Sequence, residues 1–300
     1  MSYRSWEPNA IGSIVPPFGG SGGGPPPPPA GPDRFAPKYL VGNVPAGDSN
    51  VVYSSGGFFY LPDPGDGSGI AAALAAAVLV AGDVWIRPGI YNLGSGSVVT
   101  PLVVPTYCLV RGAGEATQIL GKASVDQGVF RLFGAGSGLR DLRIEAPPAA
   151  EPTAGSIAVV SVVNARCSVQ GCVVAVSADA ASALLYGIDA QGSAANITNN
   201  RIISNGTNAS GVPLRLSGGA AAASGNAIAA SAADVAAIFI ASSENACTSN
   251  VCNLGAAPTT AAIVLAAGAD NNIVLGNVCR TTPSVDDTAG GVGNEVAHNI

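Results

Sequence analysis

The chain has 300 residues, with 40 glycines, 22 prolines and a formal net charge of −6. Charged residues make up 11% of it, less than half of the usual share of about 25%, whereas hydrophobic residues make up 48%. The negative charge argues against nucleic acid as the main partner, and the longest uncharged apolar run, residues 70–82, is shorter than the about 20 residues of a membrane-spanning helix. The small and aliphatic residues favour a β-rich chain with many turns.

Residues 1–35 are predicted to form an extended Pro/Gly-rich anchoring arm. A Gly-rich stretch is flexible, and the five prolines at 25–29 favour a stiff polyproline II segment, so neither can build a core. A disordered tail is the alternative. Five apolar side chains favour an arm with a docking surface: Trp6, Ile11, Ile14, Val15 and Phe18. No apolar stretch follows a basic segment at the N-terminus, so no secretory signal is expected.

Residues 36–100 are predicted to form an N-terminal cap. Short strands are expected at residues 51–53 and 58–61, followed by an Ala-rich helix over residues 68–80. Ser68 is the expected N-cap of this helix, and Gly82 ends it. The next segment, residues 83–93, indicates a strand, a Pro-Gly turn and a second strand.

Residues 101–300 repeat a short unit with asparagine at fixed places, which predicts parallel β-helix coils. The clearest copy is Asn245-x-Cys247-x-x-Asn250, and looser copies have Gly171 or Asp141 in the second asparagine position. Repeats of about 20 to 30 residues built from short strands are typical of solenoids. Asparagine tolerates a left-handed bend, and stacked amides can hydrogen-bond from coil to coil. The expected asparagine ladder consists of Asn200, Asn226, Asn250, Asn277 and Asn299.

Two segments carry a resemblance to a known family. They are Gly82-Asp-Val-Trp-Ile-Arg-Pro-Gly-Ile-Tyr-Asn-Leu93 after the helix and Leu109-Val-Arg-Gly-Ala-Gly-Glu-Ala-Thr-Gln-Ile-Leu120. Over residues 65–300 the chain resembles the pectate-lyase-like parallel β-helix superfamily. The resemblance implies an all-β, right-handed, single-stranded parallel β-helix whose N-terminal end is capped by the Ala-rich helix. That superfamily includes pectate lyases, polygalacturonases and bacteriophage tailspikes, so the motifs indicate the fold and not the activity.

The sequence contains no recognisable catalytic constellation. Glycosidases need two carboxylates at a set separation, and only Asp189 and Asp234 are weak candidates for a catalytic role. The pair Asp286-Asp287 is expected in a solvated turn, and the only histidine, His298, near the last turn. The six cysteines lack a C-x-x-C spacing, so we expect neither a metal site nor a cofactor. Whether the chain is an enzyme stays open, with non-enzymatic function favoured.

Aligning the second strands of the coils by their terminal Gly or Ser places Asp189 beside Arg215, as a cross-coil ion pair. The same alignment places Ile240 and Leu265 at that position in the next two coils, which predicts an apolar outward face. Such a face indicates a subunit interface, although a loop of the same chain could cover it. The expected interface residues are Val160, Val162, Ile238, Ile240, Ile263 and Leu265.

Two further features lie near the C-terminus. Cys252 and Cys279 occupy the same repeat position, so their sulfurs are expected to stack or to form a bond. The chain stops at Ile300 in mid-repeat, which suggests that a partner covers this end.

These observations favour a non-enzymatic structural protein of a bacteriophage-like virion, such as a head decoration, fibre or spike. Its partners would be itself, as a homotrimer, and other virion proteins through the arm. We expect synthesis in a host cytoplasm and location in the virion. The alternatives are a carbohydrate-active tailspike, acting as a polysaccharide lyase or glycosidase, and a glycan-binding module for a host surface glycan.

Overall fold

The structure is a computed structural model that describes residues 38–43, 52–54, 58–80, 82–95, 98, 100–121, 128–146, 156–176, 184–204, 211–230, 235–255, 261–280, 283–288 and 291–300. In this part the chain forms an all-β parallel solenoid with one short helix, which confirms the predicted fold class. The arm predicted for residues 1–35, with its five apolar side chains, lies outside the described residues. The division between a cap at 36–100 and coils at 101–300 stays a prediction.

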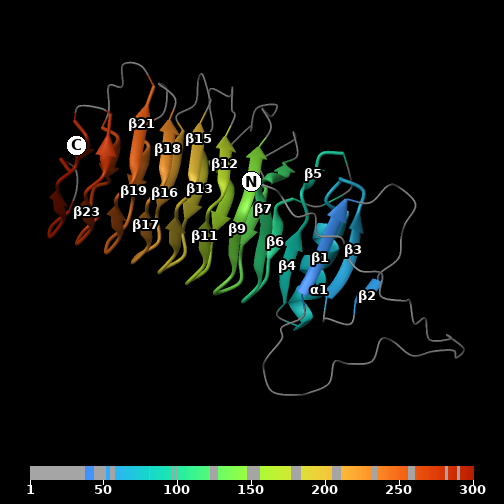
Figure 1. The fold of residues 1–300 in the computed structure, drawn as a ribbon. Coiled ribbons are helices and arrows are strands. Elements are labelled where there is room, and N and C mark those ends of the chain that lie inside the picture. The colour runs from blue at the N-terminus through green and yellow to red at the C-terminus, as the bar shows by residue number, and fades with distance from the viewer. Residues whose placement is uncertain are drawn as a thin grey trace, which may run out of the picture. The chain divides into compact units, whose positions relative to one another are not determined.

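Three parallel strands and the helix form the start of the solenoid (Figure 1). Strand β1 (Lys38–Asn43) pairs with both β3 (Phe58–Asp63) and β4 (Asp83–Ile86), and β2 (Val52–Ser54) runs antiparallel to β3. Helix α1 (Ser68–Val80) connects β3 to β4 and packs against β1 and β3. Its buried side chains have the spacing of a single helix face: Ile70, Ala73, Leu74 and Ala77.

The helix begins at Ser68, as predicted, but two aspartates bind its first amides. Asp63 is fully buried and accepts hydrogen bonds from the backbone N–H groups of Gly67 (3.0 Å) and Ile70 (3.2 Å). Asp66 accepts one from the backbone N–H of Ser68 (2.9 Å). Hydrogen bonds from the Ser68 side chain and backbone lower the pKa of Asp66. Carboxylates near a helix N-terminus are favoured by the helix dipole, so Asp63 and Asp66 provide the capping expected of Ser68.

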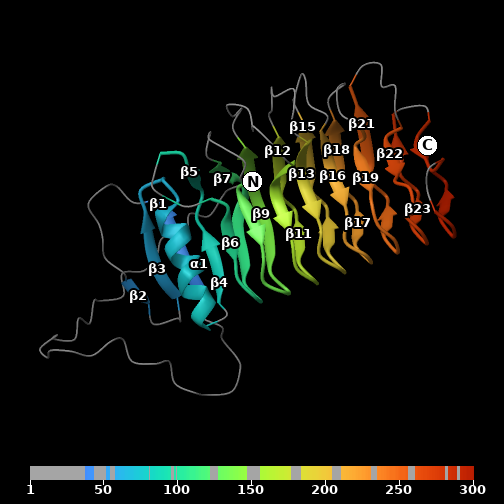
Figure 2. The same cartoon turned by 180° about the vertical axis from the view of Figure 1, so that it is seen from behind.

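The coils alternate between two parallel sheets, which we call sheet A and sheet B. Sheet A also contains β1 to β4, and each strand of a coil pairs with the equivalent strands of its neighbours (Figures 1 and 2). Sheet B contains eight strands: β6 (Leu102–Val104), β8 (Phe130–Leu132), β10 (Ser156–Val162), β13 (Leu184–Ala190), β16 (Val212–Leu216), β19 (Ile238–Ile240), β22 (Ile263–Leu265) and β25 (Val285–Asp286). The coil strands of sheet A are β5 (Gly89–Asn92), β7 (Leu109–Leu120), β9 (Gly138–Ala146), β11 (Ser168–Gln170), β12 (Val173–Val176), β14 (Asn196–Thr198), β15 (Arg201–Ser204), β17 (Ala222–Ser224), β18 (Ala227–Ala230), β20 (Ala246–Thr248), β21 (Val251–Leu254), β23 (Ile273–Leu275), β24 (Val278–Cys279) and β26 (Glu295–Ala297).

A left-handed residue bends the chain between the two short strands that each coil contributes to sheet A. This bend precedes the ladder asparagine by one residue, so the asparagine itself does not supply the positive φ that we expected of it. The residues at this bend are Asp141, Gly171, Asn199, Gly225, Ser249, Gly276 and His298, with φ between 52° and 64°. Asp141 and Gly171 thus occupy the bend position, and Leu142 and Cys172 occupy the asparagine position of their coils.

The five asparagines form a hydrogen-bonded ladder through the solenoid. Asn226 donates to Asn250 Oδ1 from both its backbone N (3.0 Å) and its Nδ2 (2.9 Å), and Asn250 does the same to Asn277 Oδ1 (3.0 and 2.9 Å). Asn200 and Asn277 repeat the pattern toward the next coil. Asn200, Asn226, Asn250 and Asn277 therefore each bind the coil that follows, and Asn299 ends the ladder as the acceptor of Asn277.

A second asparagine row lies five residues earlier in the sequence. Asn245 donates from its backbone N (2.8 Å) and Nδ2 (3.1 Å) to Asn272 Oδ1, and Asn272 donates in the same way to Asn294 Oδ1. Asn245 in turn accepts a hydrogen bond from Ala221 N (3.0 Å). The last coils are consequently held at two corners, since asparagine recurs at both positions there.

The predicted apolar interface on sheet B is wrong, because its six residues point into the core. The side chains of Val160, Val162, Ile238, Ile240, Ile263 and Leu265 are 0–1% exposed. Arg215 pairs with Phe239, and Phe239 pairs with Val264. The alignment that placed Ile240 beside Arg215 is therefore off by one residue, and such a slip moves every side chain to the opposite face. Val160 and Val162 pair with core-facing Ile188 and Ala190.

Loss of a ladder side chain is expected to destabilise the whole solenoid. We predict that Asn250→Ala lowers the free energy of unfolding by about 2–4 kcal/mol, because it leaves buried donors of Asn226 without their acceptor. Urea unfolding followed by circular dichroism measures this change. Asn253→Ala on the same strand is the control, since Asn253 is exposed, and it should change the free energy by less than about 0.5 kcal/mol. Equal losses in both variants would contradict a stabilising ladder.

Candidate functional site

Asp189 lies on the outward face of sheet B in a row that crosses all coils. The row runs Val103, Arg131, Ser161, Asp189, Arg215, Phe239, Val264 and Asp286, each paired in register with the next. Although it faces outward, Asp189 is only 3% exposed. A buried carboxylate needs partners, so its contacts decide what it can do.

Both carboxylate oxygens of Asp189 are occupied. Oδ1 accepts a hydrogen bond from Ser217 Oγ (2.9 Å), and Oδ2 accepts one from Gln191 Nε2 (2.8 Å). Arg215 Nη1 lies 3.8 Å from Oδ2, so the predicted cross-coil ion pair is present. Arg215 Nη1 also donates to the hydroxyl of Tyr186 (3.2 Å), and its guanidinium carbon lies 5.0 Å from the centre of the Tyr186 ring.

These contacts fit a structural function for Asp189 better than acid–base catalysis. A general acid or base must reach the proton that it transfers, whereas this carboxylate is enclosed and fully engaged. The other catalytic candidate, Asp234, lies outside the described residues. Asp286 accepts two hydrogen bonds from Thr288, which lower its pKa at the surface, and Asp287 accepts one from Asn294 (3.0 Å). Asp286 is the last residue of strand β25 and pairs with Val264, and Asp287 follows it, so the pair lies at the end of a sheet B strand and not wholly in the solvated turn that we expected.

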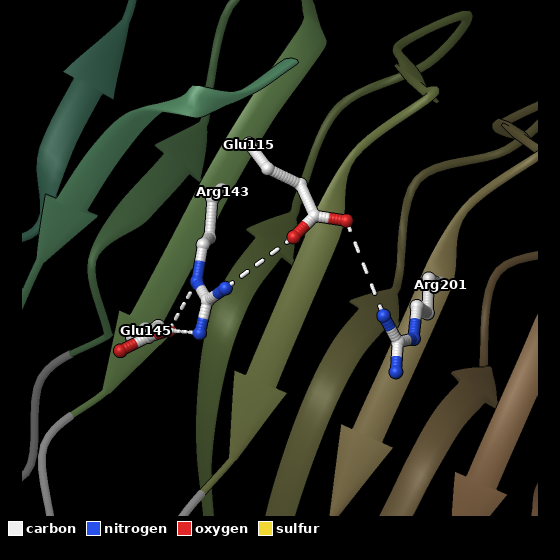
Figure 3. Close-up of polar contacts among 4 residues, drawn as sticks. All are labelled: Glu115, Arg143, Glu145 and Arg201. Carbon is white, nitrogen blue, oxygen red and sulfur yellow. Dashed lines mark hydrogen bonds and ion pairs between the residues drawn. The ribbon is translucent and has the colours of Figure 1, made fainter. Parts of the chain in front are cut away.

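A chain of ion pairs crosses the outer face of sheet A near the start of the solenoid. Figure 3 shows the carboxylate of Glu115 between the guanidinium groups of Arg143 and Arg201. Glu115 Oε2 lies 3.4 Å from Arg143 Nη1, and Oε1 lies 4.0 Å from Arg201 Nη1. Arg143 also binds Glu145 on its own strand. All four side chains are at least partly exposed, so each pair contributes only about 0–1 kcal/mol.

This ion-pair chain was not predicted, because it depends on an irregularity in β7. Strand β7 pairs with β9 through two register shifts, between Arg111 and Gly114 and between Gly114 and Gln118. The extra residues bulge outward and are closed by a hydrogen bond from Ala113 N to Thr117 Oγ1 (2.9 Å). The bulge carries Glu115 across β12 to reach Arg201 on β15. Gly112 and Gly114 are the only sequence signal of the bulge.

All six cysteines are buried and free. Burial raises the pKa of Cys108, Cys172 and Cys247 to about 12. These thiols therefore stay protonated at neutral pH and are poor nucleophiles. Within the described ranges, no group of three or more His, Cys, Asp or Glu residues could hold a metal ion. None of the helices in these ranges is long and apolar enough to cross a membrane.

No family model matches the chain, and no curated protein sequence matches it significantly. Among solved structures, it is similar to the Dettilon tailspike protein, with 13% identity and a TM-score of 0.43, over 77% of this chain and 54% of that one. It is similar to Escherichia coli YbhC, with 13% identity and a TM-score of 0.47, over 89% and 77%. It is also similar to the Agl-KA catalytic domain, with 14% identity and a TM-score of 0.47, over 85% and 52%. The chain spans about half the length of the tailspike structure. At these values the comparisons carry no inference about activity.

The buried thiols should make the fold sensitive to alkaline pH. Burial raises the pKa of these thiols in the folded chain from the ordinary value of 9.0 to about 12, so the stabilisation is complete below pH 9 and is lost as pH rises toward 12. Each thiol accounts for about 1.4 kcal/mol of the loss at pH 10. We predict that Cys172→Ala reduces the fall in unfolding free energy between pH 8 and pH 10 by about this amount in urea titrations. Val169→Ala, a buried change without a titrating group, should leave the fall unchanged. An unchanged fall in Cys172→Ala would sink the prediction.

Replacing Asp189 should cost stability. We predict that Asp189→Ala lowers the free energy of unfolding by about 2–4 kcal/mol, because it leaves the partly buried Arg215 without its carboxylate. Arg201→Ala in the exposed ion-pair chain should cost less than about 1 kcal/mol. Thermal unfolding of the two variants measures the difference, and a smaller loss for Asp189→Ala than for Arg201→Ala would contradict the structural assignment.

Proposed function

We propose that the chain is a non-enzymatic structural protein of a virion-like particle, such as a head decoration, fibre or spike. Its solenoid associates with copies of itself, most simply as a homotrimer, and its N-terminal arm binds other proteins of the particle. The observation that carries this proposal is an uncharged and largely apolar surface on the outer face of sheet A.

This surface, which we call the neutral strip, lies on strands β17, β18, β20, β21, β23 and β24, and these strands contain no charged residue. Val251, Ile273 and Val278 stand on it with 40–44% of their surface exposed, and Val251 pairs with Val278 on the next coil. The ion-pair chain covers the same face of sheet A in the earlier coils. An exposed apolar patch bordered by charged groups is typical of a protein interface.

The neutral strip replaces the sheet B residues that sequence alignment indicated. Most of its outward side chains are small or β-branched, with Asn253 and Leu275 as exceptions, so a second solenoid can approach along its length. Asp189 is buried and both of its carboxylate oxygens are hydrogen-bonded, which favours a structural function of the chain over a catalytic one. These features support association, and the arm supports attachment, because a Pro-rich segment loses little entropy when it binds.

A glycan-binding module is the second candidate, and a pair of aromatic residues favours it. Tyr107 and Phe133 lie on successive coils with 70% and 54% of their surface exposed. The guanidinium carbon of Arg131 lies 5.2 Å from the centre of the Phe133 ring. Exposed rings next to a cation can stack on sugar rings. Binding to a glycan array that is lost in a Tyr107→Ala, Phe133→Ala double variant would favour this function.

Self-association tests the main proposal. We expect native mass spectrometry of the full chain at micromolar concentration to detect trimers, and Val251→Lys with Val278→Lys to shift the protein to monomers. Lysine places a charge in the strip that subunit contact would have to desolvate. Val103→Lys, at an equally exposed valine on sheet B, is the control and should leave the assembly intact. A monomeric wild-type chain would overturn the proposed association.

Attachment through the arm has its own test. Removal of residues 1–35 is expected to abolish incorporation into the particle and to leave the circular dichroism of the solenoid unchanged. Incorporation is measured by protein analysis of purified particles. If the shortened chain is still incorporated, the arm is not the anchor.

A further inference from the structure

Two cysteines on successive coils face each other in the core near the C-terminal end of the described solenoid. Strands β21 and β24 place Cys252 directly opposite Cys279 in the parallel ladder. The side chains are 0% and 6% exposed, and both thiols are free. Hydrogen bonding with the Cys279 side chain and burial raise the pKa of Cys252. The pair is thus in direct contact without being bonded.

The geometry of a parallel ladder suits a bond between these sulfurs. Neighbouring parallel strands lie about 4.8 Å apart, which falls within the Cα separation of about 4.4–6.8 Å found in disulfides. Cys247 is the nearest comparison, because it is equally buried but lies opposite Ala223 and Val274. Cys167 has Ser137 as its contact on the preceding coil (3.4 Å). Cys252 and Cys279 are therefore the cysteines that the ladder register brings together.

We propose that Cys252 and Cys279 are a modification site at which a small-molecule disulfide, such as oxidised glutathione, forms a cross-coil disulfide bond. The Cys279 thiolate attacks one glutathione sulfur, and the first glutathione leaves as a thiolate. Cys252 then attacks Cys279 Sγ in the mixed disulfide and releases the second glutathione. The two cysteines are oxidised, one glutathione disulfide is reduced to two glutathiones, and the protons of both thiols pass to the leaving thiolates.

Cys279 is the first nucleophile in this sequence for two reasons. It is the more exposed of the two, and hydrogen bonding from Cys252 lowers its pKa. Strand β24 contains only two residues, so few ladder hydrogen bonds oppose its local opening toward the oxidant. The disulfide then ties β24 to β21 and encloses one complete coil, including β22 and β23. Local opening is the step that the new bond suppresses.

Whether Cys252 and Cys279 are thiols or a disulfide depends on the redox conditions around the protein. In a reducing cytoplasm the pair stays as thiols, and in an oxidising medium it becomes a covalent link between coils. For a particle that leaves its host, the link would form after assembly; this consequence rests on the proposed function, whereas the chemistry of the pair does not.

The test uses the full chain, reduced with dithiothreitol, freed of it and incubated with oxidised glutathione. After an acid quench and unfolding, the free thiols are counted, and disulfide-linked peptides are mapped by mass spectrometry. We expect a loss of two of the six thiols and a linked pair of peptides that contain Cys252 and Cys279. Hydrogen exchange at the amides of β24 should be slower in the oxidised chain than in the reduced one.

Two variants separate this site from general thiol oxidation. Cys279→Ala should lose no thiols to a disulfide, and Cys247→Ala should still lose two. A wild-type chain that keeps six thiols, a stable glutathione adduct on one cysteine, or a bond between other cysteines would overturn the proposal. Because the mapping is done on the wild-type chain, a variant that fails to fold does not remove the test. Particle incorporation, measured separately, reports on the proposed function alone.

Discussion

Buried asparagine amides that bind each coil to the next are the constraint on which this structure depends. The Oδ1 atom of one asparagine accepts two hydrogen bonds from the asparagine of the preceding coil. Inside a core, leaving an amide without a partner costs more free energy than its hydrogen bond contributes. A shift of the strand register by even one residue is therefore strongly disfavoured. That register determines which side chains of both sheets face outward, and with them the charged and neutral parts of the surface.

The coils were predictable because asparagine is rare in cores, so its repeated spacing stands out against small apolar residues. The orientation of sheet B was not predictable in the same way. Ile238, Phe239 and Ile240 are all apolar, so alternation along β19 contains no information about which of them faces the core. Arg215 and its register partner Phe239 are 24 residues apart in the sequence, and sheet B has no asparagine row that would show which residue of β19 aligns with Arg215. The ion pair of Asp189 with Arg215 was predicted correctly because both residues are charged and therefore conspicuous.

The outer surface was harder to predict than the interior, because it depends on departures from the repeat. The bulge in β7 adds residues to one strand only, and periodicity cannot predict an event that occurs once. Its effect is to carry Glu115 over a neighbouring strand, so that the charges of the early coils neutralise each other. The strands of sheet A from β17 to β24 have no such bulge in the described residues and present an uncharged surface instead, which ends at Glu295 on β26. The difference between these two parts is the basis of the proposed association.

The constant separation of five residues between the two asparagine rows has a consequence for how such a chain can change. Asn245 and Asn250, Asn272 and Asn277, and Asn294 and Asn299 keep this separation, whereas the distance from one coil to the next varies between 22 and 27 residues. Length variation is therefore confined to the remainder of each coil, where a longer connection costs little. Whole coils can be duplicated, removed or fitted with new projecting segments while the contacts between neighbours stay the same, which makes the solenoid a modular scaffold.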